Sequence, residues 1–239
     1  MSATNSALFP VAILAGGLAT RMRPVTENVP KSMLDVGGEP FISQQLKLLR
    51  AKGVRRVVLC VGFLGEMIRD FVGDGLRFDL QVEYSFDGAE RRGTAGAIKN
   101  ALTRLGDRFF VMYGDSYLDC DFVAVQHAFE VYSGAKALMT VFKNNGRWDR
   151  SNIEFENGRI VRYDKRDPTP NMRFIDYGLG IFTAGLFDRV GLTGTFDLAD
   201  VYVRASNDHV LTGFEVDRRF YEIGSPEGLR ETDQLLRQK

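Results

Sequence analysis

The feature that most constrains the fold is a regular alternation of short apolar runs with segments of helical period, which fills the chain up to residue 142. The apolar runs predict buried strands at Val11–Leu14, Val54–Val61, Leu80–Tyr84, Phe109–Tyr113 and Ala137–Phe142. The segments between them predict helices at Phe41–Ala51, Glu66–Val72, Thr94–Leu105 (with Thr94 as N-cap) and Phe122–Tyr132. Strands that alternate with helices of this length form βαβ units with right-handed crossovers and a parallel sheet.

The pattern changes after Lys143. Two short apolar segments flank Asn157-Gly158, which predicts a β-hairpin. Further strands are predicted at Ile175–Phe182, Val210–Val216 and Phe220–Ile223, and further helices at Leu198–Ala205 and Pro226–Arg237. The fold class we expect is α/β: a Rossmann-like three-layer sandwich with a mainly parallel central sheet and an antiparallel C-terminal part. We expect one domain over residues 1–239, with halves at about 8–142 and 143–239.

Composition narrows the class of protein. The formal net charge is zero, which argues against a general nucleic-acid or membrane-surface binder, and only two histidines are present, which makes a histidine-rich zinc site improbable. Cys60 and Cys120 each lie in or beside an apolar run, which favours a reduced compartment and a packing role. The N-terminal ten residues have neither a basic region nor an apolar core, so no secretory signal is predicted. We therefore expect a cytoplasmic protein without nucleic-acid or membrane partners.

A candidate anion site follows the first predicted strand. Gly16 and Gly17 can turn the chain sharply and bring backbone N–H groups close to an anion, and Arg21, Arg23 and Lys31 follow. The pattern is neither the dinucleotide fingerprint nor a P-loop, and two glycines after a strand are by themselves more often a plain turn. The basic residues shift the interpretation towards phosphate binding at the edge where open α/β sheets bind ligands.

Two acidic residues are candidates for a metal site. Asp115 follows the strand at 109–113 across a glycine, which directs a carboxylate into the crevice where Mg²⁺ and phosphate could meet, although Gly-Asp after a strand can also be only a turn. Glu222 lies in the segment FYEIGSPE and on its own could be a solvated glutamate on an edge strand.

Taken together, the motifs resemble those of the sugar-1-phosphate nucleotidyltransferases. LAGGLATRMRP…VPKSML resembles the family signature, and GTAGA, YGD, YDK, DYG and EIGSPE follow in the family's order from Val11 to about Leu229. Ala19, Ser32, Asp164, Arg166 and Glu222 stand where the family usually has Gly, Pro, Glu, Pro and Asp. GAIKNAL and EIGSPEGL look most like heptose-1-phosphate guanylyltransferases and N-acetylmuramate-1-phosphate uridylyltransferases.

The resemblance implies transfer of a nucleoside monophosphate from an NTP, with GTP or UTP favoured, to a sugar 1-phosphate, with Mg²⁺ as cofactor. It makes 8–142 the nucleotide-binding half and 143–239 the sugar-binding half. It implies catalytic roles for Arg21, Lys31 and Asp115, and metal binding by Asp115 and Glu222. It implies nucleotide contacts from Leu14, Ala15, Gly16, Gly17, Arg21, Gly93 and Thr94, and sugar-phosphate contacts from Asp164, Lys165 and Gly178.

Several alternatives stay open. The chain could be a cytidylyltransferase of a non-sugar phosphate or phosphonate, or a catalytically inactive ligand-sensing relative. Trp148 could pack over a substrate or simply anchor its loop, and the run Glu90-Arg91-Arg92 could be solvated or touch the nucleotide. Arg150-Ser151 stands where many relatives have Tyr-Gly, which implies a differently shaped sugar pocket. The sequence leaves open the base, the sugar and the oligomeric state, for which a homo-oligomer is one of the options.

Overall fold

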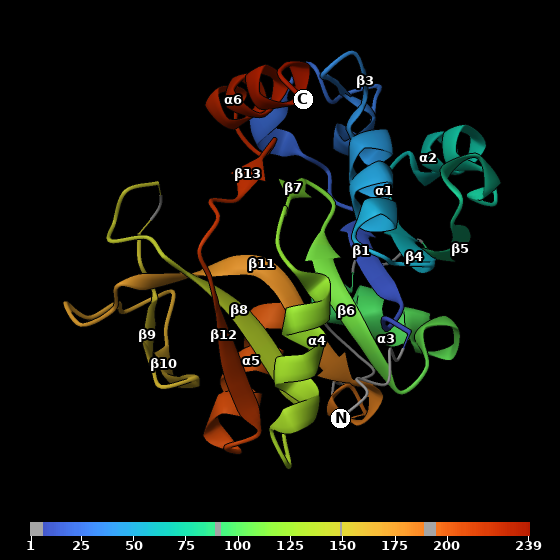
Figure 1. Ribbon diagram of the computed structural model, residues 1–239. Coiled ribbons are helices and arrows are strands. Elements are labelled where there is room, and N and C mark those ends of the chain that lie inside the picture. Colours follow the sequence, from blue (N-terminus) through green and yellow to red (C-terminus); the bar gives the residue numbers. More distant parts are fainter. Residues whose placement is uncertain (1–6, 89–91, 149, 189–194) are drawn as a thin grey trace.

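A computed structural model describes residues 7–88, 92–148, 150–188 and 195–239. Within these residues a nine-stranded sheet crosses the molecule in the order β5-β4-β1-β6-β11-β8-β12-β10-β9 (Figure 1). Its strands are β1 (Val11–Ala15), β4 (Arg56–Val61), β5 (Gln81–Phe86), β6 (Arg108–Tyr113), β8 (Ala137–Lys143), β9 (Ile153–Glu156), β10 (Arg159–Tyr163), β11 (Phe174–Thr183) and β12 (Leu211–Val216). The short strands β2 (Asp35–Val36) and β3 (Glu39–Pro40) form one separate pair, and β7 (Ser116–Tyr117) and β13 (Tyr221–Glu222) form another.

Helices cover both faces of the sheet (Figure 1). They are α1 (Phe41–Ala51), α2 (Gly65–Val72), α3 (Gly93–Leu105), α4 (Phe122–Val131), α5 (Leu198–Asn207) and α6 (Pro226–Arg237). Short 3₁₀ turns occur at Thr20–Met22, Lys31–Met33, Leu76–Phe78 and Ala184–Leu186.

The central strand β1 shows why the layers form. Its first three residues are fully buried because side chains of a parallel strand are covered on both faces. Val11 and Ile13 belong to the core cluster that includes side chains of α1, α2 and α4. Ala12, which points to the opposite face, belongs to the cluster shared with α3 and α5. The alternation along one strand therefore builds two cores, one on each side of the sheet.

The sheet is mixed rather than mainly parallel. The pairs among β5, β4, β1 and β6 are parallel, as predicted for the first half. β8 follows α4 and continues the strand–helix alternation, but it does not pair with β6 in the structure. β11 lies between them and is antiparallel to both. Half of the neighbouring strand pairs are consequently antiparallel. The local sequence pattern indicates that a strand exists but not which strands lie beside it, so this order was not predicted.

The predicted elements themselves are confirmed, with ends that differ by one or two residues for most of them. Periodicity does not resolve β2, β3 or β7, because two residues carry no period, whereas β13 falls within the predicted strand Phe220–Ile223. The pairing of β7 with β13 matters for the site, since β13 brings Glu222 opposite Ser116, the residue after Asp115. In the part of the chain that the structure describes, no helix has the length and apolar character needed to cross a membrane.

Candidate active site

The loop after β1 forms the floor of a cavity of about 740 Å³, here called the first cavity. Leu14, Ala15, Gly16 and Gly17 all line it, as predicted for a glycine-rich loop at the carboxyl end of a central strand. A Cβ on Gly16 would lie 2.5 Å from Asp87 Oδ2 and 3.2 Å from the Gly62 nitrogen, whereas one on Gly17 would meet no atom within 4 Å. A side chain at Gly16 would therefore displace the Asp87 carboxylate and crowd the Gly62 backbone, whereas Gly17 borders open space.

Ala19 holds a backbone conformation that normally selects glycine. Its φ of 48° and ψ of 41° are left-handed, and its carbonyl oxygen accepts hydrogen bonds from the Met22 nitrogen and from Thr26 Oγ1 at 2.9 Å each. Glycine, which the family usually has at this position, adopts this conformation without strain. Ala19 adopts the same conformation with local backbone strain.

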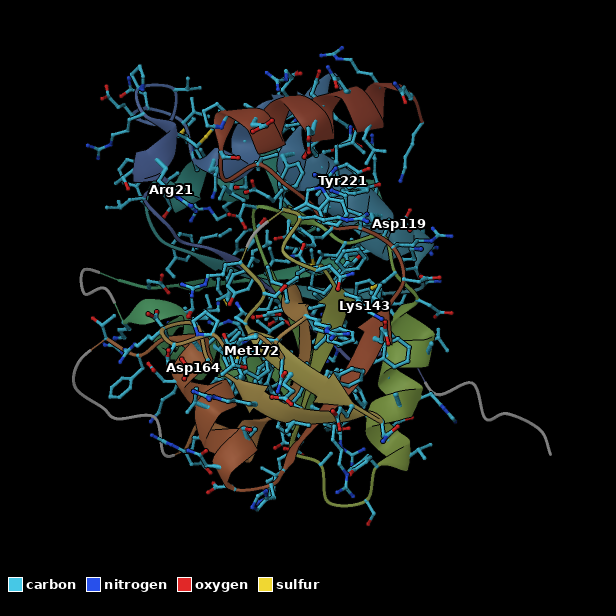
Figure 2. All side chains as sticks on the ribbon, turned by 90° about the vertical axis from the view of Figure 1, so that its left-hand side faces the viewer. Arg21, Asp119, Lys143, Asp164, Met172 and Tyr221 are labelled. Atoms are coloured by element: carbon cyan, nitrogen blue, oxygen red, sulfur yellow. The ribbon has the colours of Figure 1, made fainter. Side chains whose placement is uncertain are left out.

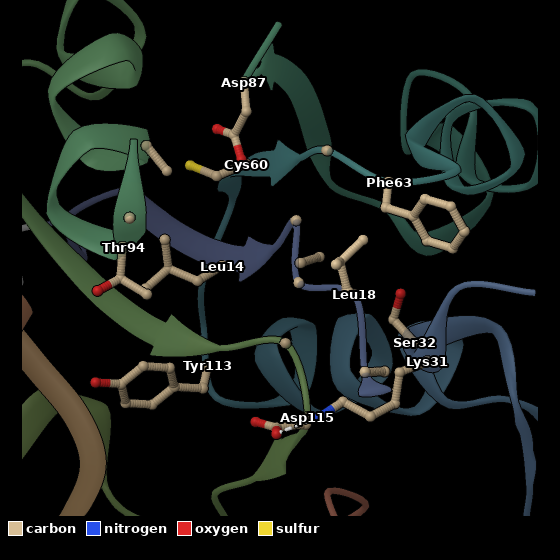
Figure 3. Close-up of a pocket in the computed structure, with 18 of the residues that line it drawn as sticks. Leu14, Leu18, Lys31, Ser32, Cys60, Phe63, Asp87, Thr94, Tyr113 and Asp115 are labelled. Carbon is tan, nitrogen blue, oxygen red and sulfur yellow. Dashed lines mark hydrogen bonds and ion pairs between the residues drawn. The ribbon is translucent and has the colours of Figure 1, made fainter. Parts of the chain in front are cut away.

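Lys31 and Asp115, predicted from two separate motifs, lie in direct contact (Figure 3). Lys31 Nζ is 2.6 Å from Asp115 Oδ2, and both side chains are about one-fifth exposed at the wall of the first cavity. Gly114 allows this placement, because a Cβ there would lie 2.7 Å from the Leu14 carbonyl oxygen. The end of β6 therefore approaches the end of β1 closely and brings the carboxylate to the glycine loop.

Glu222 reaches the same point from the C-terminal part. The Ile223 nitrogen donates to the Asp115 carbonyl oxygen at 2.9 Å as β13 pairs with β7. The Glu222 carboxylate accepts hydrogen bonds from the Gly224 nitrogen and from Ser225 Oγ, the latter at 2.9 Å. A Cβ on Gly224 would lie 3.3 Å from Asp115 Oδ2 and 3.5 Å from Arg21 Nη2, and it would collide with Glu222 Oε2. Two carboxylates and a guanidinium thus converge around one glycine.

The donor set fits Mg²⁺. Among the described residues, no group of three or more His, Cys, Asp and Glu side chains could hold a metal. Mg²⁺ is commonly bound by one or two carboxylates, with phosphate oxygens and water as the other ligands, and the pair Asp115 and Glu222 meets that requirement. Gly228 leaves room for the longer glutamate, because a Cβ there would collide with Glu222 Oε1.

A second cavity, of about 730 Å³, opens on the other side of Asp115. Tyr113 and Asp115 line both cavities. The predicted residues Lys165, Gly178 and Glu222 line the second cavity, and so does Arg21, which the sequence placed with the nucleotide. Arg21 therefore stands at the junction rather than inside the first cavity.

Asp164 lies apart from these residues. It lines neither of these two cavities, and its Oδ1 accepts the backbone N–H groups of Arg166 and Asp167 at 2.9 Å each. Figure 2 shows it well separated from Arg21. These hydrogen bonds hold the pKa of the Asp164 carboxyl below its usual value, and the carboxylate serves the turn after β10.

Gly93 and Thr94 line the first cavity, but both also join α3 to the chain before α5. Gly93 has a φ of 74°, and a Cβ there would collide with the Phe196 carbonyl oxygen. The predicted N-cap role of Thr94 is wrong, because α3 begins one residue earlier and Arg92 occupies the N-cap position. The Thr94 hydroxyl instead accepts a hydrogen bond from the Leu198 nitrogen at 2.7 Å, at the start of α5.

Two further residues of the site, Asp87 and Arg219, were not singled out from sequence. Asp87, after β5, lines the first cavity. Arg219 lines the second, where its guanidinium lies 4.7 Å from the Trp148 ring centre and forms an ion pair with Glu231. Trp148 also packs on Phe142, at 5.5 Å between ring centres, so it both anchors its loop and faces the cavity. Strand order and ring stacking create these positions, and neither leaves a local sequence signal.

Two carboxyl groups in the cavities have perturbed acidity. Burial raises the pKa of Asp176, which lines the second cavity, and its Oδ1 accepts the Gly178 nitrogen at 2.9 Å. Burial also raises the pKa of Asp87, and nearby Arg92 opposes part of the rise. Arg92 lines the first cavity, whereas Glu90 and Arg91 of the same run lie outside the described residues.

Comparison with known proteins gives one consistent family. Residues 11–188 match the model of the nucleotidyl transferase family. The chain is 42% identical over 225 residues to the N-acetylmuramate alpha-1-phosphate uridylyltransferase of Neisseria meningitidis, covering 93% of this chain and 96% of that one. It is 28% identical over 220 residues to the catalytic subunit beta of mannose-1-phosphate guanylyltransferase of Xenopus tropicalis, and spans 61% of that relative's length.

Solved structures share the fold. The crystal structure of a Bacillus anthracis candidate glucose-1-phosphate thymidylyltransferase superposes with a TM-score of 0.84 at 21% identity, over 97% of this chain and 96% of that one. The inositol-1-phosphate CTP transferase of T. maritima superposes with a TM-score of 0.78 at 22% identity, over 96% and 95%. At these identities the likeness describes the fold and not the substrate.

Proposed function

The chain belongs to the nucleotidyl transferase family, and on that premise we propose that it transfers a nucleoside monophosphate from an NTP to a sugar 1-phosphate. The products are an NDP-sugar and pyrophosphate. The first cavity would take the nucleotide and the second the sugar phosphate.

One observation carries the proposal: Asp115 lines both cavities, and Lys31, Glu222 and Arg21 lie around it. The nucleoside monophosphate passes from one substrate to the other, so the two substrates must meet at one point. The junction of the cavities is such a point. It carries both signs of charge, which suits binding of phosphates and of a divalent cation.

The proposed chemistry needs no protein nucleophile. A phosphate oxygen of the sugar phosphate forms a bond to the α-phosphorus of the NTP, and the bond from that phosphorus to the pyrophosphate oxygen breaks. The second pKa of a phosphate monoester is about 6, so the attacking group is already mostly ionised at neutral pH and no general base is required. The protein contributes positioning and neutralisation of charge.

Each residue at the junction has a part in that task. Lys31 would bind the triphosphate from the wall of the first cavity, and Arg21 would neutralise charge that accumulates on the leaving pyrophosphate. Lys165 would hold the phosphate of the incoming sugar in the second cavity. Asp115 and Glu222 would hold Mg²⁺, which when bound supplies positive charge to the phosphate oxygens.

The relatives favour UTP or GTP as the donor, since those compared above include a uridylyltransferase and a guanylyltransferase. The more similar of the two acts on N-acetylmuramate 1-phosphate, which makes an N-acetylated sugar 1-phosphate with UTP the first pair to test. A cytidylyltransferase remains the second candidate, because the T. maritima CTP transferase shares the fold.

The test measures pyrophosphate release from each of five NTPs combined with a panel of sugar 1-phosphates, with Mg²⁺ present. We expect one nucleotide and a narrow group of sugars to support turnover, and removal of Mg²⁺ by a chelator to stop it. The absence of pyrophosphate release for every pair, together with no thermal stabilisation by any NTP, would contradict the proposal and favour an inactive relative.

A further inference from the structure

A third cavity, of about 900 Å³, adjoins the second one and has no part in the proposed function. It lies between the turn after β8 and the segment that connects β10 to β11. Four residues line both the second and the third cavity and form their shared boundary: Arg147, Trp148, Arg150 and Pro168. A ligand in the second cavity could therefore extend a substituent across this boundary into the third.

The charges around the third cavity differ from those around the second. Five cationic and five acidic side chains line the second cavity. The described residues that line the third include no acidic side chain but three exposed arginines: Arg147, Arg150 and Arg173. Neither Arg147 nor Arg173 forms an ion pair in the part of the chain that the structure describes. A cavity with this excess of positive charge attracts an anion.

The turn that carries Arg147 is held by its own hydrogen bonds. Asn145 and Gly146 have φ values of 48° and 73°, which is the left-handed pair of a tight two-residue turn. The Arg147 nitrogen donates to the Asn144 carbonyl oxygen at 3.1 Å and closes this turn. The carbonyl oxygen of Arg173 accepts the backbone N–H groups of Asn144 and Asn145 at 3.0 Å each. The backbone thus fixes Arg147 and Arg173 on neighbouring segments.

The departure from the family's pattern at Arg150-Ser151 contributes to the same cavity. Arg150 lines both the second and the third cavity. The buried Ser151 hydroxyl accepts a hydrogen bond from the Gly146 nitrogen at 3.2 Å, which fastens the turn. The usual Tyr-Gly pair would supply neither the guanidinium nor the hydroxyl. The change in sequence therefore accompanies the formation of a cationic cavity beside the sugar-phosphate cavity.

We propose that the third cavity binds a second anionic group, a carboxylate or a phosphate, that the sugar 1-phosphate carries. Lys165 would hold the phosphate at C1 in the second cavity, while Arg147 and Arg173 would bind the second anion across the boundary. Guanidinium groups suit both anions because they offer paired N–H donors. This inference rests on the proposed function and goes beyond it by restricting the acceptor to acidic sugar phosphates.

The first experiment changes the charge of the acceptor. We compare kcat/KM for N-acetylmuramate 1-phosphate with that for its carboxyl methyl ester, and for glucuronate 1-phosphate with that for glucose 1-phosphate. Glucose 1,6-bisphosphate tests a phosphate in place of the carboxylate. Because the arginines are exposed, we expect a preference of about tenfold for the acidic acceptor over its neutral counterpart, and a weaker preference at high salt.

The second experiment changes the residue. Arg173 lines the third cavity but not the second, so Arg173→Gln should reduce the preference for the acidic acceptor about fivefold or more. The matched control is Arg108→Gln, which replaces an exposed arginine of β6 outside all three cavities and should leave the preference unchanged. If Arg173→Gln does not fold, the paired acceptors still decide the question on the wild-type chain.

The results distinguish this inference from the proposed function. Wild-type turnover that is as efficient with a neutral sugar 1-phosphate as with every acidic one overturns the anion site and leaves the transferase intact. An unchanged preference for acidic acceptors in folded Arg173→Gln also overturns it. No pyrophosphate release with any acceptor, together with no thermal stabilisation by any NTP, removes the proposed function and this inference together.

Discussion

The two cavities on either side of Asp115 are built by different means. The first lies at the carboxyl ends of the parallel strands β1, β4, β5 and β6, and its lining includes Gly16, Gly17, Gly62 and Gly114. The second is formed in the antiparallel half, where charged side chains such as Arg147, Arg150, Lys165, Asp176 and Arg219 come from loops and strand ends. On the proposed assignment of the substrates, the nucleotide site would depend largely on the path of a glycine-rich backbone, whereas the sugar-phosphate site would depend on charged side chains.

Asp115, which lines both cavities, gives the largest expected effect. Asp115→Asn removes the charge that pairs with Lys31 and that would hold the proposed Mg²⁺, so we expect turnover to fall by about 1,000-fold with little change in Tm. Pyrophosphate release measures the first quantity and thermal unfolding the second. Asp70→Asn, which removes an exposed acid on α2, is the control. Near-normal turnover in Asp115→Asn would contradict the proposed role of this residue in metal binding.

A Cβ added at a glycine in the wall of the first cavity should lower the stability of the fold. In Gly93→Ala the new Cβ meets the Phe196 carbonyl oxygen at a φ of 74°, and we expect a loss of about 2–3 kcal/mol, or roughly 5–10 °C in Tm. Gly158→Ala, in the turn between β9 and β10, is the control, since its φ is also 79° but no atom lies within 4 Å. It should cost only about 1 kcal/mol. Equal losses in the two variants would show that Phe196 does not constrain the wall.

A change of side chain should affect the second cavity through binding alone. Lys165→Ala is expected to raise the KM for the sugar phosphate about tenfold, because a charged contact to the phosphate is lost, while the Kd for the NTP stays constant. Asp164→Asn is the neighbouring control and should change either constant by less than about twofold, since its carboxylate serves a turn. If the NTP affinity falls together with that for the sugar phosphate, the proposed assignment of one substrate to each cavity is wrong.

The smallest effect concerns the acid inside the second cavity. Burial raises the folded-state pKa of Asp176, so stability falls as the pH rises from the ordinary carboxyl pKa to the raised one, and this cost is absent below the ordinary carboxyl pKa. Asp176→Asn should therefore raise Tm at pH 7–8, by about 1–3 °C, and the gain should shrink as the pH approaches 4. Tm measured across that range checks the slope.

Asp233→Asn provides a control of opposite sign. Hydrogen bonds from Arg237 and from the Gly37 nitrogen hold the pKa of Asp233 below its usual value. Its charge stabilises the fold at neutral pH, and that stabilisation is lost as the pH falls. The variant should thus be less stable than the wild type at pH 7, with a difference that narrows on acidification. A Tm difference in Asp176→Asn that grows on acidification would contradict the assignment.

The same contrast explains how far the sequence could predict the molecule. Strands, helices and the glycine loop carry local signals, and Lys31, Asp115 and Glu222 meet as their motifs predict. Strand order has no local signal in the sequence. The insertion of β11 beside β6 and the approach of Asp87 to Gly16 could therefore not be predicted. Asp164 was assigned by resemblance, yet two backbone N–H groups of its own turn hold its carboxylate.

The pairing of β7 with β13 has a consequence for how the site would fail on heating. The hydrogen bond from the Ile223 nitrogen to the Asp115 carbonyl oxygen ties the two acids together, and β13 is only two residues long. A pairing of two residues a side has few hydrogen bonds, and such pairings open locally at a lower free energy than the global fold. Heating should therefore abolish catalysis before the central sheet unfolds, and the amide proton of Ile223 should exchange with solvent in step with that loss.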